Sequence, residues 1–96
     1  MIEGINKAFE SRVRLGIMSA LMVNERLDFN EMKNLLSVTD GNLSSHISAL
    51  EKLKYLDVKK EFVGKRPKTS YRATPLGKNE FQTHLNALEK LLNGLS

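Results

Sequence analysis

The stretch from residue 39 to residue 56 constrains the fold most, because its side chains divide one helix into two unlike faces. At 100° per residue, Leu43, Ile47 and Leu50 fall on one narrow arc, which is expected to face a core together with the stem of Lys54. Short hydroxyl, amide and imidazole groups, which suit close approach to base edges and phosphates, lie on the other side, so a DNA recognition helix is predicted. The outer arc and its flanks comprise Gly41, Asn42, Ser44, Ser45, His46, Ser48, Ala49 and Lys52.

The placement of charge favours DNA contact over the alternative, an ordinary amphipathic surface helix, which the helical pattern alone fits equally well. The formal net charge is +4. Residues 59–72 hold six cations against Glu61 alone, a net charge of +5, which leaves −1 for the rest of the chain. Such local basic character is typical of an electrostatic footprint on a polyanion. The six cations are Lys59, Lys60, Lys65, Arg66, Lys68 and Arg72.

Length and composition allow one small domain and exclude several kinds of site. A chain of 96 residues can bury one modest core, so dimerisation would help its stability. The absence of cysteine excludes disulfides, thiolate nucleophiles and cysteine-ligated zinc, and it is compatible with the cytoplasm, where we expect the protein to act. Neither a membrane span nor a signal peptide is expected, because no long apolar run and no basic leader are present.

The first half of the chain predicts three helices before the recognition helix. Ser11 is expected to cap the broad-faced second of these, in which Arg12 and Arg14 are expected to be solvated. Asn30 and Thr39 are expected to cap the next two helices, and the tight joint between them matches the helix-turn-helix pattern. The predicted elements are an amphipathic helix at 2–10, a core helix at 11–24, a brief strand at 27–29 and a helix at 30–37.

The second half predicts a β-hairpin with a basic tip and a final helix. Residues 56–63 and 69–74 are rich in β-branched and aromatic side chains, and 64–68 lie between them. Alternation places Leu56, Val58 and Phe62 on one face, matched by Tyr71 and Ala73 on the partner strand. Thr74 and Pro75 supply the cap and first residue of a helix that runs to about Asn93.

The final helix carries an apolar seam whose members are spaced by four, three and four residues. This spacing suits helix-on-helix packing, and we expect both the N-terminal helix and the same helix of a second subunit to use it. The residues expected at the dimer interface are Ile2, Ile5, Phe9, Phe81, Leu85, Leu88 and Leu92.

Three segments together resemble winged helix-turn-helix regulators of the MarR/ArsR-like type, closest to the minimal winged-helix branch. They are Leu43-Ser-Ser-His-Ile-Ser-Ala-Leu-Glu-Lys-Leu53, Gly64-Lys-Arg-Pro-Lys-Thr69 and Thr74-Pro-Leu-Gly-Lys78, and the resemblance covers roughly residues 11–92. It implies a mainly α (α+β) fold in one domain, 1–96: a winged core at 11–74 with helices at 2–10 and 75–93 for dimerisation. It also implies a homodimer that binds double-stranded DNA and regulates transcription. The cysteine or clustered-histidine metal sensors of some relatives are missing here, so no metal or other cofactor is expected, and a small-molecule effector is left open.

On this reading the recognition helix supplies the specificity and the wing supplies the affinity. The operator is expected to be an inverted repeat with recognition helices about 34 Å apart. The DNA-binding residues expected in the recognition helix are Thr39, Asn42, Ser44, Ser45, His46, Ser48 and Lys52, and those expected in the wing are Lys60, Lys65, Arg66, Lys68 and Thr69.

Two other functions are weighed against DNA binding. A protein-interaction or dimerisation module without specific DNA binding is the alternative, since Asp40 and Glu51 near the helix face would repel phosphate. An enzyme is not expected, because adjacent side chains such as Ser45 and His46 diverge by about 100° on a helix and do not form a nucleophile and base pair. His84 is expected on the surface or in the seam.

Overall fold

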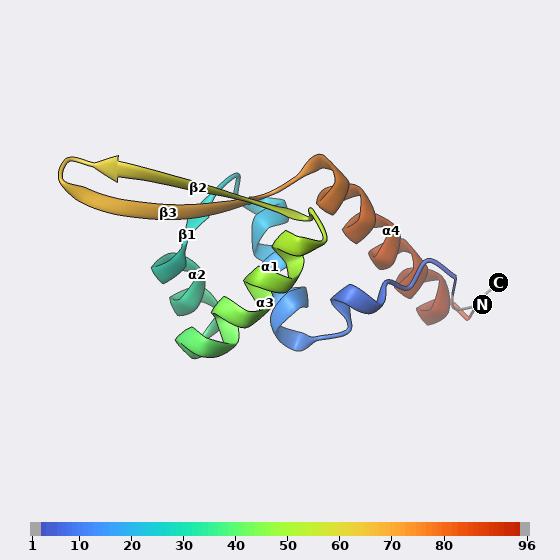
Figure 1. Ribbon diagram of the computed structural model, residues 1–96. Coiled ribbons are helices and arrows are strands. Elements are labelled where there is room, and N and C mark those ends of the chain that lie inside the picture. Colours follow the sequence, from blue (N-terminus) through green and yellow to red (C-terminus); the bar gives the residue numbers. More distant parts are fainter. Residues whose placement is uncertain (1–2, 95–96) are drawn as a thin grey trace.

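The helices and strands follow one another in the order predicted for a winged helix-turn-helix domain. The computed structural model describes residues 3–94 (Figure 1). The short 3₁₀ turn η1 precedes a three-helix core, a hairpin and a last helix. The elements are η1 (Lys7–Phe9), α1 (Arg12–Val23), β1 (Leu27–Asp28), α2 (Phe29–Leu36), α3 (Asp40–Lys52), β2 (Leu56–Val63), β3 (Arg66–Ala73) and α4 (Pro75–Leu92).

Side-chain caps set the starts of the helices. Ser11 and Thr39 accept hydrogen bonds from the first turns of α1 and α3, as predicted. The predicted cap of α2, Asn30, is wrong, because Asp28 occupies that position. The Asp28 carboxylate accepts from Glu31 N–H (2.8 Å), and the Glu31 carboxylate accepts from Asp28 N–H (2.9 Å), a reciprocal capping box.

The end of α3 also differs from the prediction, which had the stem of Lys54 on the buried arc. The helix ends at Lys52, and Lys54 is exposed with a left-handed φ of 67°. The N–H groups of Lys54 and Tyr55 donate to the carbonyls of Glu51 (2.9 Å) and Leu50 (3.0 Å). These two bonds form a Schellman motif, which satisfies the last carbonyls of the helix and turns the chain into β2.

The three strands form an antiparallel sheet in the order β1-β3-β2. The hairpin is longer than predicted, since β3 begins at Arg66 rather than Thr69 and only Gly64 and Lys65 form the turn. Gly64 has a φ of 68°, which such a tight turn requires. Because β1 pairs only with Ser70 and Tyr71, the outer half of β3 has one free edge, where a proline such as Pro67 is tolerated.

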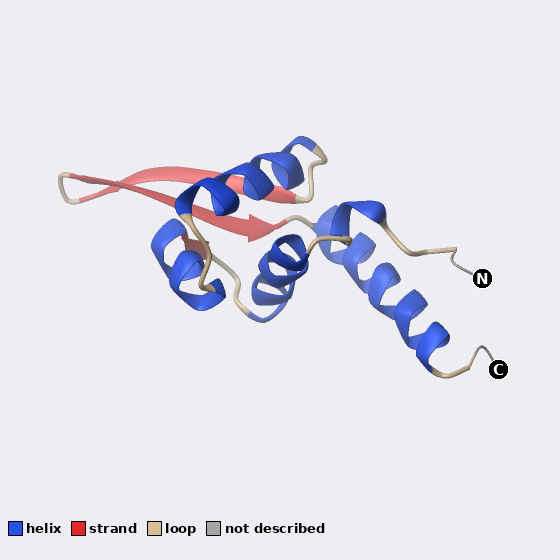
Figure 2. Ribbon diagram, turned by 90° about the horizontal axis from the view of Figure 1, so that it is seen from below, coloured by secondary structure: helices blue, strands red, loops and turns tan. Residues whose placement is uncertain are grey.

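The core lies between the helices and one face of the sheet. Helices α1, α2 and α3 lie below the sheet in Figure 1. The predicted face of the hairpin is confirmed at its base, where Leu56, Tyr71 and Ala73 are buried with side chains of α1, α2 and α3. The molecule measures 56 × 25 × 21 Å. The hairpin tip lies at one end of this length and α4 at the other (Figures 1 and 2).

The predicted helix at 2–10 is wrong, because among its described residues only Lys7–Phe9 form a helical turn, and a 3₁₀ one. Gly4 has a φ of 89° and Asn6 is extended, and both conformations interrupt an α-helix. The Asn6 carboxamide instead caps the turn by accepting from Ala8 N–H (2.9 Å). Ile2 lies outside the described residues.

An aromatic cluster attaches this N-terminal segment to the rest of the chain. Phe9 packs edge-on against Phe81 with ring centroids 5.1 Å apart, and it also contacts Tyr55 and His84. His84 is 3% exposed, so a position on the surface is wrong, whereas its contacts with Phe9 and Phe81 agree with the alternative prediction of a position in the seam. Its Nδ1 accepts from Asn6 N–H (2.9 Å), and that bond explains how a polar side chain is accommodated there.

Two hydrogen bonds join the start of α4 to the segment that follows α3. Tyr55 carbonyl accepts from Thr74 N–H (3.0 Å), and the Thr74 hydroxyl donates to Lys54 carbonyl (2.7 Å). Gly77 in the first turn of α4 lies so close that a Cβ there would meet the Tyr55 carbonyl oxygen at 2.2 Å. Only glycine permits this approach, so the base of the hairpin and both helices form one joint.

Candidate nucleic-acid interface

The predicted division of α3 into two faces is present in the structure. Leu43, Ile47 and Leu50 are buried in the core. The outer face is exposed, and it includes most of the residues expected to contact DNA: Thr39, Asn42, Ser44, Ser45, Ser48 and Lys52. This face offers hydroxyls, an amide and one ammonium group on a helix without bulky outer side chains, which is the chemistry needed to approach base edges.

His46 differs from the other predicted recognition residues, because the chain itself holds its ring. Arg14 Nε–H donates to His46 Nδ1 (3.0 Å), and Arg14 Nη1 donates to Ala8 carbonyl (3.4 Å). The imidazole is half-buried. The prediction that Arg14 is solvated is therefore wrong, since its guanidinium links η1, α1 and α3. Its unfavourable position in the first turn of α1 was the one sequence signal for such a partner.

Four cations of the hairpin are available to an external anion. Lys59 forms an ion pair with Glu61 (3.6 Å), and Arg72 donates to Asp57 through Nε (3.2 Å) and Nη2 (2.9 Å). In the part of the chain that the structure describes, none of the four other cations forms an ion pair with a carboxylate. These four wing cations, all exposed, are Lys60, Lys65, Arg66 and Lys68.

The wing cations lie on both faces of the ribbon. Directly opposite residues share a face and neighbours along a strand alternate. Lys60 lies opposite Thr69 on the face that continues from the core, whereas Arg66 and Lys68 lie on the other face. The structure thus brings the predicted wing residues to one hairpin end but distributes them around it, as suits a ribbon that anions approach from two sides.

The residues expected at a dimer interface separate into two groups. Phe9 and Phe81 are fully buried in the chain's own core, so their predicted place in a dimer interface is wrong. Leu85 and Leu92 on α4 are exposed, with 85% of Leu92 accessible, while Ile5 and Leu88 are half-buried. The distal half of α4 therefore presents an apolar surface that the described chain leaves uncovered.

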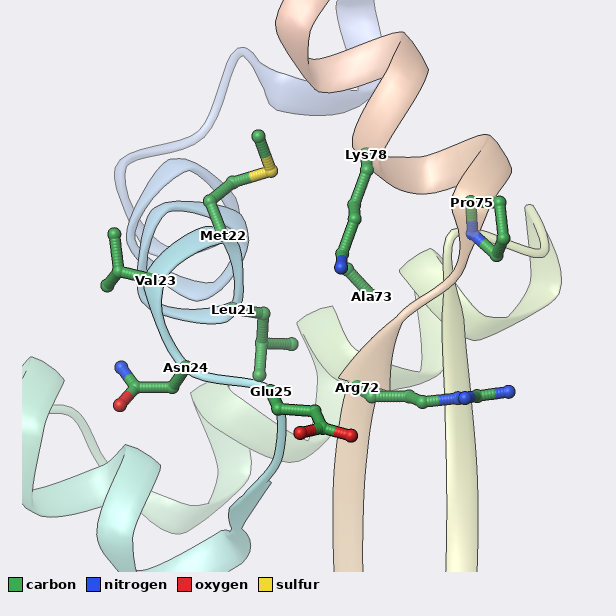
Figure 3. Close-up of a pocket in the computed structure, with 9 residues that line it drawn as sticks. All are labelled: Leu21, Met22, Val23, Asn24, Glu25, Arg72, Ala73, Pro75 and Lys78. Atoms are coloured by element: carbon green, nitrogen blue, oxygen red, sulfur yellow. The ribbon is translucent and has the colours of Figure 1, made fainter.

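A hollow of about 550 Å³ lies between the end of α1, β3 and the start of α4 (Figure 3). Lys78 points its ammonium group into it, and the Glu25 carboxylate lies at its edge. Arg72 extends away toward its partner Asp57. The hollow thus combines opposite charges with the apolar side chains of Leu21 and Met22.

Residues 3–94 contain neither a cluster of metal ligands nor a helix that could span a membrane. No group of three or more histidine, aspartate or glutamate side chains there is arranged to hold a metal ion. No helix in that range is both long and apolar enough to cross a membrane.

Comparison with known proteins agrees with this geometry. Residues 13–92 match a family model described as a winged helix DNA-binding domain. An uncharacterised protein of Methanocaldococcus jannaschii is 34% identical over 85 residues, which cover 88% of this chain and 92% of that protein. Among solved structures, a transcriptional regulator homologue from Pyrococcus horikoshii is 32% identical with a TM-score of 0.85, covering 93% of this chain and 88% of the other. A protein of Salmonella typhimurium is 26% identical with a TM-score of 0.72, covering 91% and 78%.

Proposed function

The chain belongs to the family of winged helix DNA-binding domains and is a DNA-binding regulator, and from that premise we propose that it recognises an inverted-repeat operator as a homodimer. The observation that carries the proposal is the joint exposure of two surfaces. One is the small polar outer face of α3, and the other is the set of wing cations without carboxylate partners.

These surfaces have separate tasks. The amide of Asn42 and the hydroxyl of Ser45 can donate to and accept from base edges in the major groove. The wing cations and Lys52 neutralise phosphates, an interaction that holds any sequence and weakens as salt rises. His46, already bound by Arg14, contributes less to base reading than Asn42.

The arrangement of elements supports a symmetric dimer. The N-terminal end of α3 and the hairpin tip are directed toward the end of the molecule opposite α4 (Figure 1). Two copies that pair through Leu85, Leu88 and Leu92 would keep both reading surfaces free. A two-fold axis through α4 then requires an inverted repeat, with its half-sites about 34 Å apart or a multiple of this.

The division of labour is tested by salt-dependent binding. The operator is first selected from a random pool of duplexes, and affinities for operator and random DNA are then measured by fluorescence anisotropy at several salt concentrations. Lys68→Ala should weaken binding to both duplexes and lower the salt slope by about one unit. Asn42→Ala should mainly reduce the preference for the operator.

Lys90→Ala, which removes an exposed cation at the far end of α4, is the matched control and should change neither quantity. If Asn42→Ala weakened binding to operator and random DNA equally, as Lys68→Ala should, the assignment of specificity to α3 and affinity to the wing would be refuted.

A protein-interaction module is the second candidate, favoured by the exposed carboxylates of Asp40 and Glu51 at the two ends of α3. Asp40 is paired with Lys33 (2.6 Å), so part of its repulsion toward phosphate is offset. A band-shift assay with random duplex at low salt separates the candidates. A wing that uses its cations on DNA produces a shift there, and a docking module without DNA affinity does not.

A further inference from the structure

The tip of the hairpin carries apolar side chains that nothing in the described chain covers. Phe62 is 74% exposed and Val63 is 58% exposed. Phe62 lies directly opposite Pro67, which is also exposed, and the Val63–Arg66 pair separates them from the Gly64–Lys65 turn. Leaving an aromatic ring in water forgoes most of its hydrophobic stabilisation, so the ring contributes little to the stability of the fold itself.

Phe62 has the orientation of a core residue at a place that the core does not reach. Alternation puts it on the same face as Leu56 and Val58, both of which contact the core. Phe62 is four residues beyond Val58, or roughly 13 Å along the strand. Alternation therefore directs the ring to the helix side of the sheet, and its 74% exposure means that the helices do not cover it. The hairpin extends beyond the helices in Figure 1.

The cations around the ring favour a polyanion as its binding partner. Lys60 shares its face of the ribbon, Lys65 lies in the turn, and Arg66 and Lys68 flank it on the other face. A second copy of the tip would bring the same cations together and repel. A two-stranded ribbon fits the major groove, which α3 would occupy, whereas the minor groove is about 6 Å wide, so only side chains from the hairpin tip can enter it.

We propose that Phe62, backed by Pro67, is an apolar wedge that enters the minor groove next to the site of α3 and partly unstacks one base step. This inference rests on the proposed DNA binding and adds a bend in the duplex, since wedges of this kind kink DNA. The wing cations hold the groove walls while the ring displaces water from the base edges. Pyrimidine–purine steps unstack most readily, so selected operators should carry one beneath each wing.

The test uses the full chain on its selected operator, with 2-aminopurine placed at the flanking steps to report unstacking and a donor–acceptor pair on the DNA ends to report bending. The wild type should raise the 2-aminopurine fluorescence and bring the ends closer. Phe62→Ala should abolish both signals while binding roughly tenfold more weakly, the size of one lost base–aromatic contact. Phe62→Leu, which keeps an apolar tip, should retain part of each signal.

Two controls separate a wedge from a structural role in the hairpin. Val63→Ala removes the neighbouring apolar group on the opposite face and should leave both signals intact. The salt slope of Phe62→Ala should equal that of the wild type, because an intact hairpin still delivers its cations to phosphates.

The outcomes distinguish this inference from the function on which it rests. Operator binding by the wild type without unstacking or bending, or full signals from Phe62→Ala, overturns the wedge and leaves DNA binding intact. Dissociation of a dimer by Phe62→Ala also overturns it, because the ring would then belong to a contact between copies. Failure of the wild type to bind any duplex overturns the proposed function itself, and preferential binding to anionic vesicles does the same.

Discussion

At the scale of single residues, His84 makes the stability of the fold depend on pH. Its ring is buried between Phe9 and Phe81, and its Nδ1 must stay unprotonated to accept from Asn6 N–H. Burial lowers the pKa of His84 below its ordinary value of 6.5, and the charge of Glu10 opposes this to a smaller extent.

The sign of the effect follows from proton uptake. The unfolded chain binds a proton at His84 more readily than the folded one, so the contribution is complete above about pH 6.5 and is lost as the pH falls through the lowered folded pKa. Urea denaturation between pH 7.5 and 5 should show falling stability for the wild type and a flatter profile for His84→Gln. His46→Gln is the control among the two histidines, and an unchanged profile in His84→Gln would contradict the assignment.

Gly77 is the glycine whose replacement should cost most. A Cβ at this position would meet backbone atoms of Tyr55, which cannot move aside as a flexible side chain can. We expect Gly77→Ala to lower the free energy of unfolding by about 2 kcal/mol or more, measured by urea denaturation. Gly41→Ala is the matched control, because no atom lies within 4 Å of a Cβ there, and it should raise stability by about 0.5 kcal/mol.

At the scale of elements, the cap of α2 gives a direct test of where that helix begins. Asp28→Ala removes the carboxylate that accepts from Glu31 N–H and should lower the free energy of unfolding by about 1 kcal/mol. Asn30→Ala, two residues later and exposed, should have almost no effect. Denaturation of the two variants measures both losses, and a larger loss of stability from Asn30→Ala would contradict the assignment of Asp28 as the cap of α2.

The same elements show how far sequence patterns reach. The two faces of α3 and the face of the hairpin base could be predicted, because regular spacing determines which side chains share a side. The spacing of Ile5 and Phe9 suggested a helix, yet an extended strap with one turn buries Phe9 equally well. The left-handed φ of Gly4 and the cap by Asn6 decide between these conformations, and spacing does not report either of them.

Specific hydrogen bonds between distant residues could not be predicted, although the packing of the N-terminal segment against the final helix could. Arg14 and His46 are 32 positions apart, and Asn6 and His84 are 78 apart. Each pair depends on how whole elements pack, so the free outer face of α3 was predictable as a surface, whereas the restraint on His46 within it was not. Likewise, alternation predicted which face of the hairpin carries Phe62, but it did not predict how far the hairpin extends beyond the core.

At the scale of the whole molecule, the exposed leucines of α4 predict self-association. Leu92→Glu should weaken the proposed dimer roughly a hundredfold, because an apolar contact worth about 1.5 kcal/mol or more is lost twice across a two-fold interface. Sedimentation over a range of concentrations measures this. Val23→Glu changes a residue of similar exposure on α1 and should leave the dimer intact. A wild type that stays monomeric at high concentration would rule out the dimer.

The joint of Tyr55, Thr74 and Gly77 has a mechanical consequence for such a dimer. Because two hydrogen bonds and the close approach of Gly77 connect the end of α3 to the start of α4, we expect these two helices to rotate together as a rigid unit. A change in the crossing angle of the two α4 helices would therefore be carried in full to the far ends of the dimer. The distance between the two α3 helices of the dimer would then select DNA sites by the spacing of their half-sites, independently of contacts to the bases.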